Sequence, residues 1–456
     1  MGQGPRQLWS EIGSFLSLER NVLVMSITGL LINFGYLTFQ PFIPLYLRTL
    51  EADITEIGIV FVAIQLAATL VSIPGGILAD RLGRKTIIVV GNAVGYALFF
   101  ILLGAKTWTI ALLTLFAATL FATLVQPAYS STVAESVNKE ERGRAFGTFL
   151  FMVYLGLAFG AAVGGYFSYR VDIFIVAGAG VIAAVIRLFF LRETLPPSAR
   201  ANRQTGHRSF FTGNLTRNVW LLLFALLVFN FSSGLGQPLY AIFSTDILQL
   251  SKSELGIMVG VGYLASMLGA FFAGRVSERL GIANTMSIAV ILASLFLVPW
   301  LYAPSALLAI GIFSMSGFFA QFFFVGNQAL MANITRPEER GSIIGFITTV
   351  AGFGSIAAPY VGSQIWIAMD PRTPFLLSAL LAVGVVAPLA LIHEPTAETS
   401  CPHCGRGLPV EARFCEMCGR PIHFKNCWGC GRELEESARF CDECGRDQPV
   451  LVVPAK

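Results

Sequence analysis

Charged residues are scarce in this chain, and their scarcity excludes an ordinary soluble protein. Asp, Glu, Lys and Arg make up only 13% of the 456 residues, whereas soluble domains carry about 25%. The chain has only four histidines, and it contains neither a phosphate-binding P-loop motif nor the H-E-x-x-H motif of metal hydrolases. The missing motifs and the shortage of acid–base groups argue against an enzyme.

Cysteine is absent from the first 400 residues, and all eight cysteines lie after them. Disulfides and cysteine-bound metals are therefore excluded within the body of the chain. The sequence combines a cysteine-free body with a short polar tail, and the tail needs an explanation of its own.

Long apolar segments make up the body, since 55% of the residues are hydrophobic and the mean hydropathy is +0.69. A bilayer core of about 30 Å is crossed by a helix of about 20 apolar residues, and a helix satisfies its own backbone hydrogen bonds in lipid. The pattern predicts an all-α membrane protein with twelve transmembrane helices. We place them near residues 22–47, 55–79, 86–104, 108–134, 144–168, 170–191, 218–246, 254–276, 283–301, 305–333, 342–366 and 371–393.

The positions of Lys and Arg predict the orientation of these helices. With the N-terminus inside, the inner loops and N-terminal segment of the body carry 18 Lys and Arg, Arg187 among them, and the outer loops carry five. Basic residues gather on the cytoplasmic side of a membrane protein. We therefore expect a multi-pass protein of the plasma membrane with both termini in the cytoplasm.

The body repeats itself at a constant offset of 198 residues. Three segments of the first half recur in the second, each in the same kind of loop: 55–58 and 253–256 (T-E-I-G and S-E-L-G), 80–83 and 278–281 (D-R-L-G and E-R-L-G), and 140–143 and 338–341 (E-E-R-G twice). Parallel repeats are one architecture of secondary transporters, with the substrate site between the halves. We predict two six-helix halves, 1–195 and 218–396, joined by a basic linker at 196–217.

Residues 76–85, between the second and third predicted helices, read G-I-L-A-D-R-L-G-R-K. This segment resembles the signature of the major facilitator superfamily, and the resemblance extends over about residues 22–393. The matching positions are Gly76, Leu78, Asp80, Arg81, Gly83, Arg84 and Lys85, and a degenerate copy occupies 274–281. The resemblance implies a transporter that works by alternating access of its two halves.

Asp80 would lie at the C-terminal end of a helix, where the helix dipole disfavours a carboxylate. It therefore needs another partner. The resemblance implies that Asp80 contacts the start of the eleventh helix near Ser342, and that Arg84 pairs with Glu135. Such contacts would form only when the cytoplasmic side is closed, so they would favour the outward-facing state. The alternative is a solvated basic loop that only sets the topology.

Residues 156–165 resemble the glycine-rich fifth-helix motif of drug:proton antiporters, although Ala161 stands where that family has Pro, and simple close packing explains the glycines equally well. A second departure is Leu115, where those antiporters usually carry Arg. No Asp, Glu, Lys or Arg lies clearly at mid-membrane depth in any predicted span. Two hypotheses remain open: proton coupling through a group near a helix end, such as Asp80 or Glu135, and facilitated diffusion without coupling.

Polar uncharged residues within the spans are the candidates for substrate contact, because a buried amide in lipid must find a partner. They are Asn33, Tyr36, Gln40, Gln126, Asn230, Gln237, Gln321 and Asn327. Hydrogen bonds between helices are the alternative role for each of them. A cavity with amides, aromatic rings and no fixed charge would accept a neutral or amphipathic organic molecule, and we expect the transport unit to be a monomer.

The tail, residues 397–456, contains two copies of C-x2-C-x10-C-x2-C displaced by 26 residues. Four thiolates at this spacing bind zinc tetrahedrally, and the tail resembles a double zinc ribbon. The first set is Cys401, Cys404, Cys415 and Cys418, and the second is Cys427, Cys430, Cys441 and Cys444. We predict two structural Zn²⁺ ions. Iron and a disulfide framework are the alternatives, and the reducing cytoplasm disfavours disulfides.

The charge of the tail bears on what it binds. From residue 401 it has eight Lys and Arg and eight Asp and Glu, and each tetrathiolate zinc centre adds a charge of about −2. That balance argues against nucleic acid, which requires a basic surface, and favours a cytoplasmic protein partner. Two functions follow for the whole chain: a secondary transporter that exports small organic molecules, or a non-transporting membrane sensor or scaffold that presents the ribbons.

Overall fold

The computed structural model describes residues 19–138, 141–195, 215–335 and 340–392, and short pieces of the tail at 399–400, 407–408, 424–426, 433–435 and 443–444. The chain divides into two compact units, Met1–His393 and Glu394–Lys456. The first unit holds twelve helices or helix pairs that are long and apolar enough to cross a membrane. The predicted all-α membrane body is thereby confirmed. The predicted linker, 196–217, lies almost wholly outside the described residues.

The helices of the first half are α2 (Arg20–Phe39), the short 3-10 helix η1 (Gln40–Phe42), α3 (Ile43–Thr49), α4 (Ile54–Leu82), α5 (Arg84–Ala97), α6 (Phe99–Leu102), α7 (Trp108–Leu124), α8 (Gln126–Glu135), α9 (Arg142–Gly164) and α10 (Tyr169–Phe190). Those of the second half are α12 (Arg217–Gly236), α13 (Tyr240–Asp246), α14 (Lys252–Leu280), α15 (Ile282–Trp300), α16 (Ala306–Ile334), α17 (Arg340–Ala368), α18 (Thr373–Gly384) and α19 (Val386–Ala390). Two breaks within a span coincide with a proline, Pro41 in η1 and Pro127 in α8, because proline cannot donate the helical hydrogen bond.

The repeated tetrapeptides have a structural cause. Asp53 and Glu56 form a capping box at the start of α4, and Ser251 and Glu254 form the same box at the start of α14. Each box satisfies backbone N–H groups that the first helical turn leaves without partners. Both helices end at a glycine with positive φ, 100° at Gly83 and 82° at its counterpart 198 residues later, a conformation that side chains rarely tolerate.

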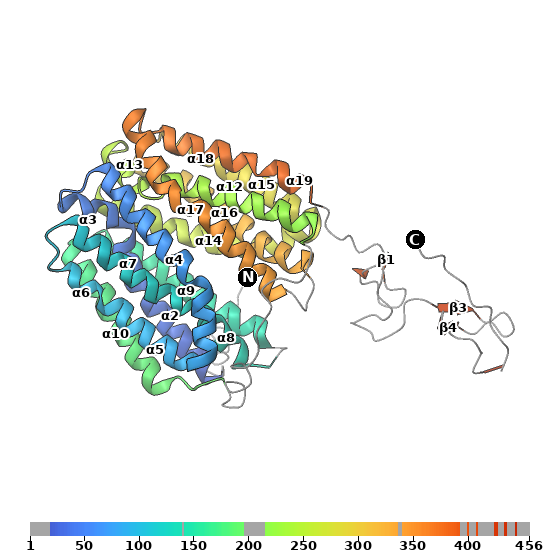
Figure 1. The fold of residues 1–456 in the computed structure, drawn as a ribbon. Coiled ribbons are helices and arrows are strands. Elements are labelled where there is room, and N and C mark those ends of the chain that lie inside the picture. The colour runs from blue at the N-terminus through green and yellow to red at the C-terminus, as the bar shows by residue number, and fades with distance from the viewer. Residues whose placement is uncertain are drawn as a thin grey trace, which may run out of the picture. The chain divides into compact units, whose positions relative to one another are not determined.

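Four helices form the contact between the halves, since α4 packs against α17 and α9 packs against α14. Figure 1 shows the first half in blue to green and the second in yellow-green to orange, with α4 and α17 adjacent. Within the first half, α9 lies along α2, and a Cβ atom at Gly156, Gly160 or Gly164 would overlap the α2 backbone. This stripe lets the two helices touch backbone to backbone.

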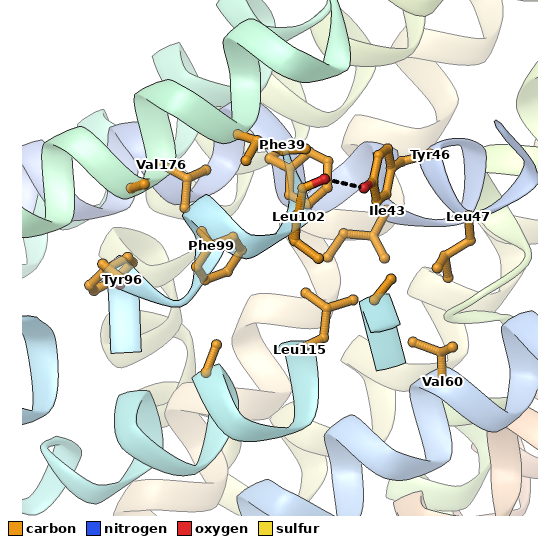
Figure 2. Close-up of a cluster of buried hydrophobic side chains, with 14 of the residues drawn as sticks. Phe39, Ile43, Tyr46, Leu47, Val60, Tyr96, Phe99, Leu102, Leu115 and Val176 are labelled. Atoms are coloured by element: carbon orange, nitrogen blue, oxygen red, sulfur yellow. Dashed lines mark hydrogen bonds between the residues drawn. The ribbon is translucent and has the colours of Figure 1, made fainter. Parts of the chain in front are cut away.

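A hydrophobic cluster centred in the first half joins α2, α3, α4, α5, α6, α7 and α10, and it includes Ile242 of α13 (Figure 2). Phe39 packs edge-on against Tyr46 and Phe99, with ring centroids 5.3 and 6.3 Å apart. The Tyr46 hydroxyl donates a hydrogen bond of 2.7 Å to the Leu102 carbonyl, at the end of α6 where helical partners run out. The cluster holds these helices together, and several of its residues also line the cavity described below.

The tail forms two small antiparallel hairpins, β1 (Thr399–Ser400) with β2 (Gly407–Leu408) and β3 (Phe424–Asn426) with β4 (Glu433–Glu435). Their registers repeat at the 26-residue offset of the cysteines: Thr399 pairs with Leu408 as Lys425 pairs with Leu434. Each loop between the paired strands contains one C-x2-C pair. Of the eight cysteines, only Cys444 lies among the described residues.

Candidate transport site and gates

The bundle has two ends, which we call the motif end, where α4 meets α5 at Gly83, and the opposite end, where α14 begins. At the motif end, Arg84 Nη2 lies 3.1 Å from Glu135 Oε1. The structure thus brings together the two residues that the superfamily resemblance paired. The Arg84 side chain is only 7% exposed and that of Glu135 is 34% exposed, so the cation is buried and the carboxylate is partly open to solvent.

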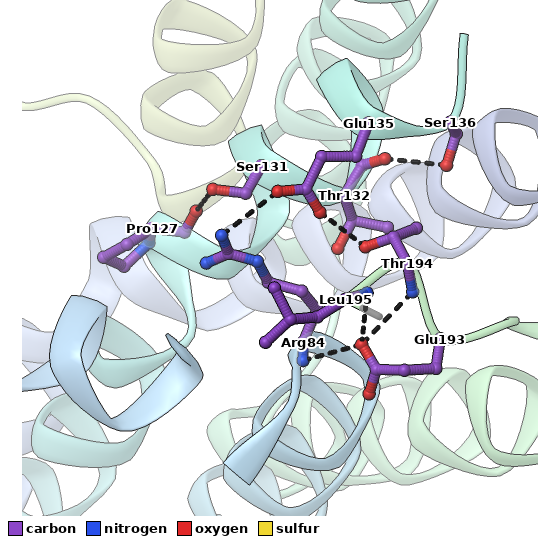
Figure 3. A network of polar contacts seen from close by, with 9 residues as sticks. All are labelled: Arg84, Pro127, Ser131, Thr132, Glu135, Ser136, Glu193, Thr194 and Leu195. Carbon is purple, nitrogen blue, oxygen red and sulfur yellow. Dashed lines mark hydrogen bonds and ion pairs between the residues drawn. The ribbon is translucent and has the colours of Figure 1, made fainter. Parts of the chain in front are cut away.

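Glu193, just after α10, completes this network (Figure 3). Its carboxylate accepts hydrogen bonds from the backbone N–H groups of Arg84 and Lys85, at 3.0 and 3.3 Å. The Thr194 hydroxyl donates to Glu135 Oε2 at 2.7 Å. Sequence reasoning missed Glu193. Gly83 at the N-cap of α5 could have indicated that such a residue was needed. Glycine has no side chain to accept hydrogen bonds from the first backbone N–H groups of the helix, so an acceptor must come from elsewhere.

The other motif residues are placed as follows. Gly76 faces Pro127 of α8, whose Cβ is the nearest atom to a built Cβ at 3.9 Å, and Arg81 is exposed. Asp80 belongs to the last turns of α4. The side chains of Asp80 and of its predicted partner Ser342 lie outside the described residues, so the gating contact stays a prediction.

Lys252 joins the two halves at the opposite end. Its ammonium group donates to Asp172 Oδ2 at 2.6 Å and to the carbonyl groups of Gly164 and Phe167 at 3.0 and 2.6 Å. It also lies 4.6 and 4.5 Å from the ring centroids of Phe42 and Tyr169, within cation–π range. Every one of these groups belongs to the first half, whereas Lys252 begins α14 of the second half. Lys252 therefore joins the start of α14 to several groups of the first half.

Three more contacts between the halves lie at this end. Arg48 Nη1 and Asp246 Oδ2 form an ion pair at 2.6 Å. The Tyr240 hydroxyl donates to the Pro41 carbonyl at 3.4 Å, and Gln364 Nε2 to the Thr55 hydroxyl at 3.2 Å. Arg48 and Asp246 are separated by 198 residues, the repeat offset, so the two halves meet there through equivalent positions.

Glycine packing changes from one end of the bundle to the other. A Cβ at Gly58 would overlap Ser363 of α17, and one at Gly256 would lie 2.5 Å from the Ala161 carbonyl oxygen of α9. Toward the motif end, Gly147 and Gly345 meet no atom of the described residues within 4 Å of a built Cβ. The polar contacts between the halves that the described residues make therefore concentrate at the opposite end.

A cavity of about 250 Å³ lies within the first half. Its wall comes from α2, α4, α5, α6, α7 and α8, together with the start of α3. The polar lining consists of Asn33, Tyr36, Asn92, Tyr96, Thr119, Thr123, Gln126 and Tyr129. Ile43, Phe99 and Leu115 of the hydrophobic cluster in Figure 2 form part of the apolar wall. The lining thus combines amides, phenols and hydroxyls with aromatic and aliphatic surface.

Three of the eight predicted substrate residues line this cavity: Asn33, Tyr36 and Gln126. The other five, Gln40, Asn230, Gln237, Gln321 and Asn327, do not. Asn230 Nδ2 instead donates to the Ala351 carbonyl of α17 at 3.0 Å, which is the interhelical role considered as the alternative. Asn92, a single amide within α5, was missed by the sequence reading.

The structure corrects the position of Arg187, which the sequence analysis counted among the basic residues of the inner loops. That count assigned it to an inner loop, but the structure places it inside α10 with no exposed surface. Its Nε donates to the Thr28 hydroxyl at 2.8 Å and its Nη1 to the Tyr129 hydroxyl at 2.7 Å. The guanidinium also lies 4.7 Å from the Tyr129 ring centroid. A buried cation therefore lies directly behind the cavity wall.

Comparison with known proteins agrees with this geometry. The Major Facilitator Superfamily model matches residues 25–244 and 222–412, which together cover the whole membrane body. The chain belongs to the Major Facilitator Superfamily. It is therefore a secondary transporter and not an enzyme, as the sequence predicted.

Relatives and solved structures support the same assignment. The chain is 24% identical over 404 residues to multidrug resistance protein MdtG of Klebsiella pneumoniae, covering 85% of this chain and 97% of that one. It is 21% identical over 263 residues to quinolone resistance protein NorA of Staphylococcus aureus, covering 56% and 66%. The nucleoside transporter NupG shares its fold with a TM-score of 0.66 at 16% identity, covering 81% of this chain and 98% of that one.

The tail matches the double zinc ribbon family over residues 401–445. The donor set fits the metal, because each copy supplies four cysteines and Zn²⁺ takes four thiolates in structural sites. The strand pairing fits as well, since one C-x2-C pair lies in the sequence between the two strands of each pair.

Proposed function

We propose that the protein is a secondary active exporter of small neutral or amphipathic organic molecules. The observation that carries the proposal is the cavity of about 250 Å³ with mixed amide and aromatic lining, in a body whose halves are joined by a breakable cross-half contact at Lys252. The names of MdtG and NorA, as multidrug and quinolone resistance proteins, point the same way.

The motif end is the cytoplasmic end in this proposal, because the basic loops lie there. The structure then corresponds to the inward-facing state, closed to the outside by Lys252 and the contacts around it. Export requires that this contact breaks after the motif end has closed around the substrate. Arg84 and Glu135 are already paired in this state, so their pair does not require closure, contrary to the expectation from the resemblance. Asp80 would act in the closure, with Arg81 and Lys85 supplying positive charge next to it.

Active export requires coupling, and proton antiport is the hypothesis that supplies it. Facilitated diffusion, the other hypothesis from the sequence, would make the protein a passive carrier, and transport that does not respond to a pH gradient would favour it. A proton gradient can drive export only if a carboxylate takes up and releases a proton as the halves move. Asp80 and Glu135 at the motif end are candidates. Asp172 is a third, because it is fully buried and contacts the opposite half through Lys252.

Transport in reconstituted vesicles tests the function. Movement of an uncharged coumarin carboxamide would be followed in vesicles containing the purified full-length protein, with and without an imposed pH gradient. Thr123→Trp should fill the cavity and abolish movement, while its matched control Leu113→Trp, on the same helix but with a 66% exposed side chain, should not. Equal rates in vesicles with and without protein would refute the proposal.

The tail has a structural role in this scheme. We propose two Zn²⁺ ions, one in the set from Cys401 to Cys418 and one in the set from Cys427 to Cys444, whose binding supplies the folding energy of so small a unit. A cytoplasmic protein is the expected partner of the ribbons. The alternative function, a non-transporting sensor or scaffold, has no need of the cavity or the Lys252 contact.

A further inference from the structure

Arg187 is a full positive charge inside the membrane body, and it does not form an ion pair with any carboxylate of the described residues. A guanidinium cannot lose its proton at any ordinary pH, and burying an unpaired charge is costly. Its Nη2 has no hydrogen-bond partner among the described residues. The local field at this point of the first half is therefore positive.

Tyr129 connects the buried charge of Arg187 to the cavity through hydrogen bonds. Its hydroxyl accepts from Arg187 Nη1 at 2.7 Å and donates to Asn92 Oδ1 at 2.8 Å. Tyr129 and Asn92 both line the cavity, and Arg187 does not. Linked hydrogen bonds polarise one another in a medium of low dielectric constant. The chain Arg187–Tyr129–Asn92 therefore strengthens Asn92 as a donor.

Asn92 presents one open group at the end of this chain. Because Oδ1 accepts from Tyr129, the orientation of the amide is fixed and Nδ2 is its remaining donor. Asn92 is 1% exposed, and Nδ2 has no hydrogen-bond partner among the described residues. A buried donor without a partner is costly, so a ligand oxygen placed in the cavity beside Nδ2 would remove that cost.

We propose that the cavity selects amphipathic organic anions, with a carboxylate oxygen of the ligand accepting from Asn92 Nδ2 and the charge of Arg187 close behind. The apolar part of the ligand would pack on Tyr96, Phe99 and Leu115 of the same wall. This inference rests on the proposed transport function and narrows its substrate class. The inference depends on the buried charge of Arg187, which the sequence had assigned to a loop.

Binding of three matched fluorescent probes tests the proposal: a coumarin carboxylate, the corresponding coumarin carboxamide, and the same coumarin with an ammonium group. Affinities would be measured by fluorescence titration with the full-length protein in lipid nanodiscs. We expect the carboxylate to bind roughly tenfold or more tightly than the carboxamide, as charge-assisted hydrogen bonds are stronger than neutral ones. The ammonium probe should bind most weakly.

Variants identify the groups responsible. Asn92→Leu should abolish the preference for carboxylate over carboxamide, and Tyr129→Phe should reduce it, because it cuts the relay but keeps the ring over Arg187. Thr119→Val, at a lining residue outside the relay, should leave the preference unchanged. Arg187→Lys, if it folds, should keep part of the preference for carboxylate. If it does not fold, Asn92→Leu and Tyr129→Phe test the proposal without it.

Two results would overturn the inference: an unchanged preference in Asn92→Leu, or a wild-type protein that binds the ammonium probe as tightly as the carboxylate. If the wild type moves the coumarin carboxamide in vesicles but shows no preference for the carboxylate, the selectivity is wrong and the transport function stands. If it neither moves nor binds any of the three probes, both are wrong.

Discussion

Replacing Lys252 by Met should open the end of the protein that faces outside in the proposed orientation. The Lys252 side chain is 21% exposed and that of Asp172 is not exposed at all, so the substitution leaves a buried carboxylate without its cation. Breaking a buried pair in this way costs about 3–5 kcal/mol. Because Lys252 is partly exposed, we take the lower value, about 3 kcal/mol.

This cost applies only to the inward-facing state, since Lys252 and Asp172 separate and become hydrated when that end opens. A shift of about 3 kcal/mol changes the ratio of the two states by more than a hundredfold, at 1.36 kcal/mol per factor of ten.

Arg48→Gln is the matched control. Arg48 and Asp246 also pair at 2.6 Å between the halves, but their side chains are 37% and 39% exposed. Such a pair contributes at most about 1 kcal/mol.

Ser363 can report the opening, because it is fully buried against Gly58 between α17 and α4. The body has no cysteine of its own, so Ser363→Cys introduces a single thiol there. A membrane-impermeant maleimide would be added from outside and labelling of the peptide containing residue 363 followed by mass spectrometry. With Lys252→Met, labelling should accelerate up to the limit set by complete opening, and with Arg48→Gln by no more than about fivefold. Labelling that is no faster with Lys252→Met than with Arg48→Gln would refute the reasoning.

Three other predictions concern the motif end and the tail. Asp80→Asn should impair transport in vesicles while the protein still inserts and folds, and normal rates would remove its gating role. Arg84→Gln should lower the free energy of unfolding by about 2 kcal/mol, since it removes the charged hydrogen bond between Arg84 and Glu135, whereas Lys85→Gln should change thermal unfolding little; equal effects would contradict the network. Metal analysis should find about two zinc ions per chain, and truncation after Glu394 should remove them and leave basal transport intact; complete loss of transport in a folded truncation would contradict that separation.

The twelve spans could be predicted because bilayer thickness imposes their length on the sequence. The repeat was visible for a similar reason. Its tetrapeptides contain capping boxes, such as Asp53 with Glu56, and helix-ending glycines, such as Gly83. These features depend on local geometry, so a short stretch of sequence is enough to reveal them. The pairing of Arg84 with Glu135 came from the superfamily resemblance and not from local pattern.

The residues that sequence reasoning missed depend on contacts between distant segments. Lys252 and Asp172 are 80 residues apart, and each stands at the end of a span, where a charge ordinarily faces water. Arg187 was counted as a loop charge because it is three residues from the end of α10. Its burial depends on Thr28 and Tyr129, which other helices bring to it. The hydropathy of one segment contains no information on such partners.

Comparison of the two halves shows how the repeat and the gates divide their roles. The caps and the helix-ending glycines recur at the 198-residue offset, and so do the charges of Asp80 and Arg81, but three other charges at the two ends do not. Lys252 occupies the position of Ile54 in the first half, Arg84 corresponds to Ile282, and Glu135 to Asn333. The repeated residues therefore provide two equivalent bundles that can rock against each other. Charges present in only one copy then make the two ends of the protein different, with a buried cross-half cation at one end and a network within the first half at the other.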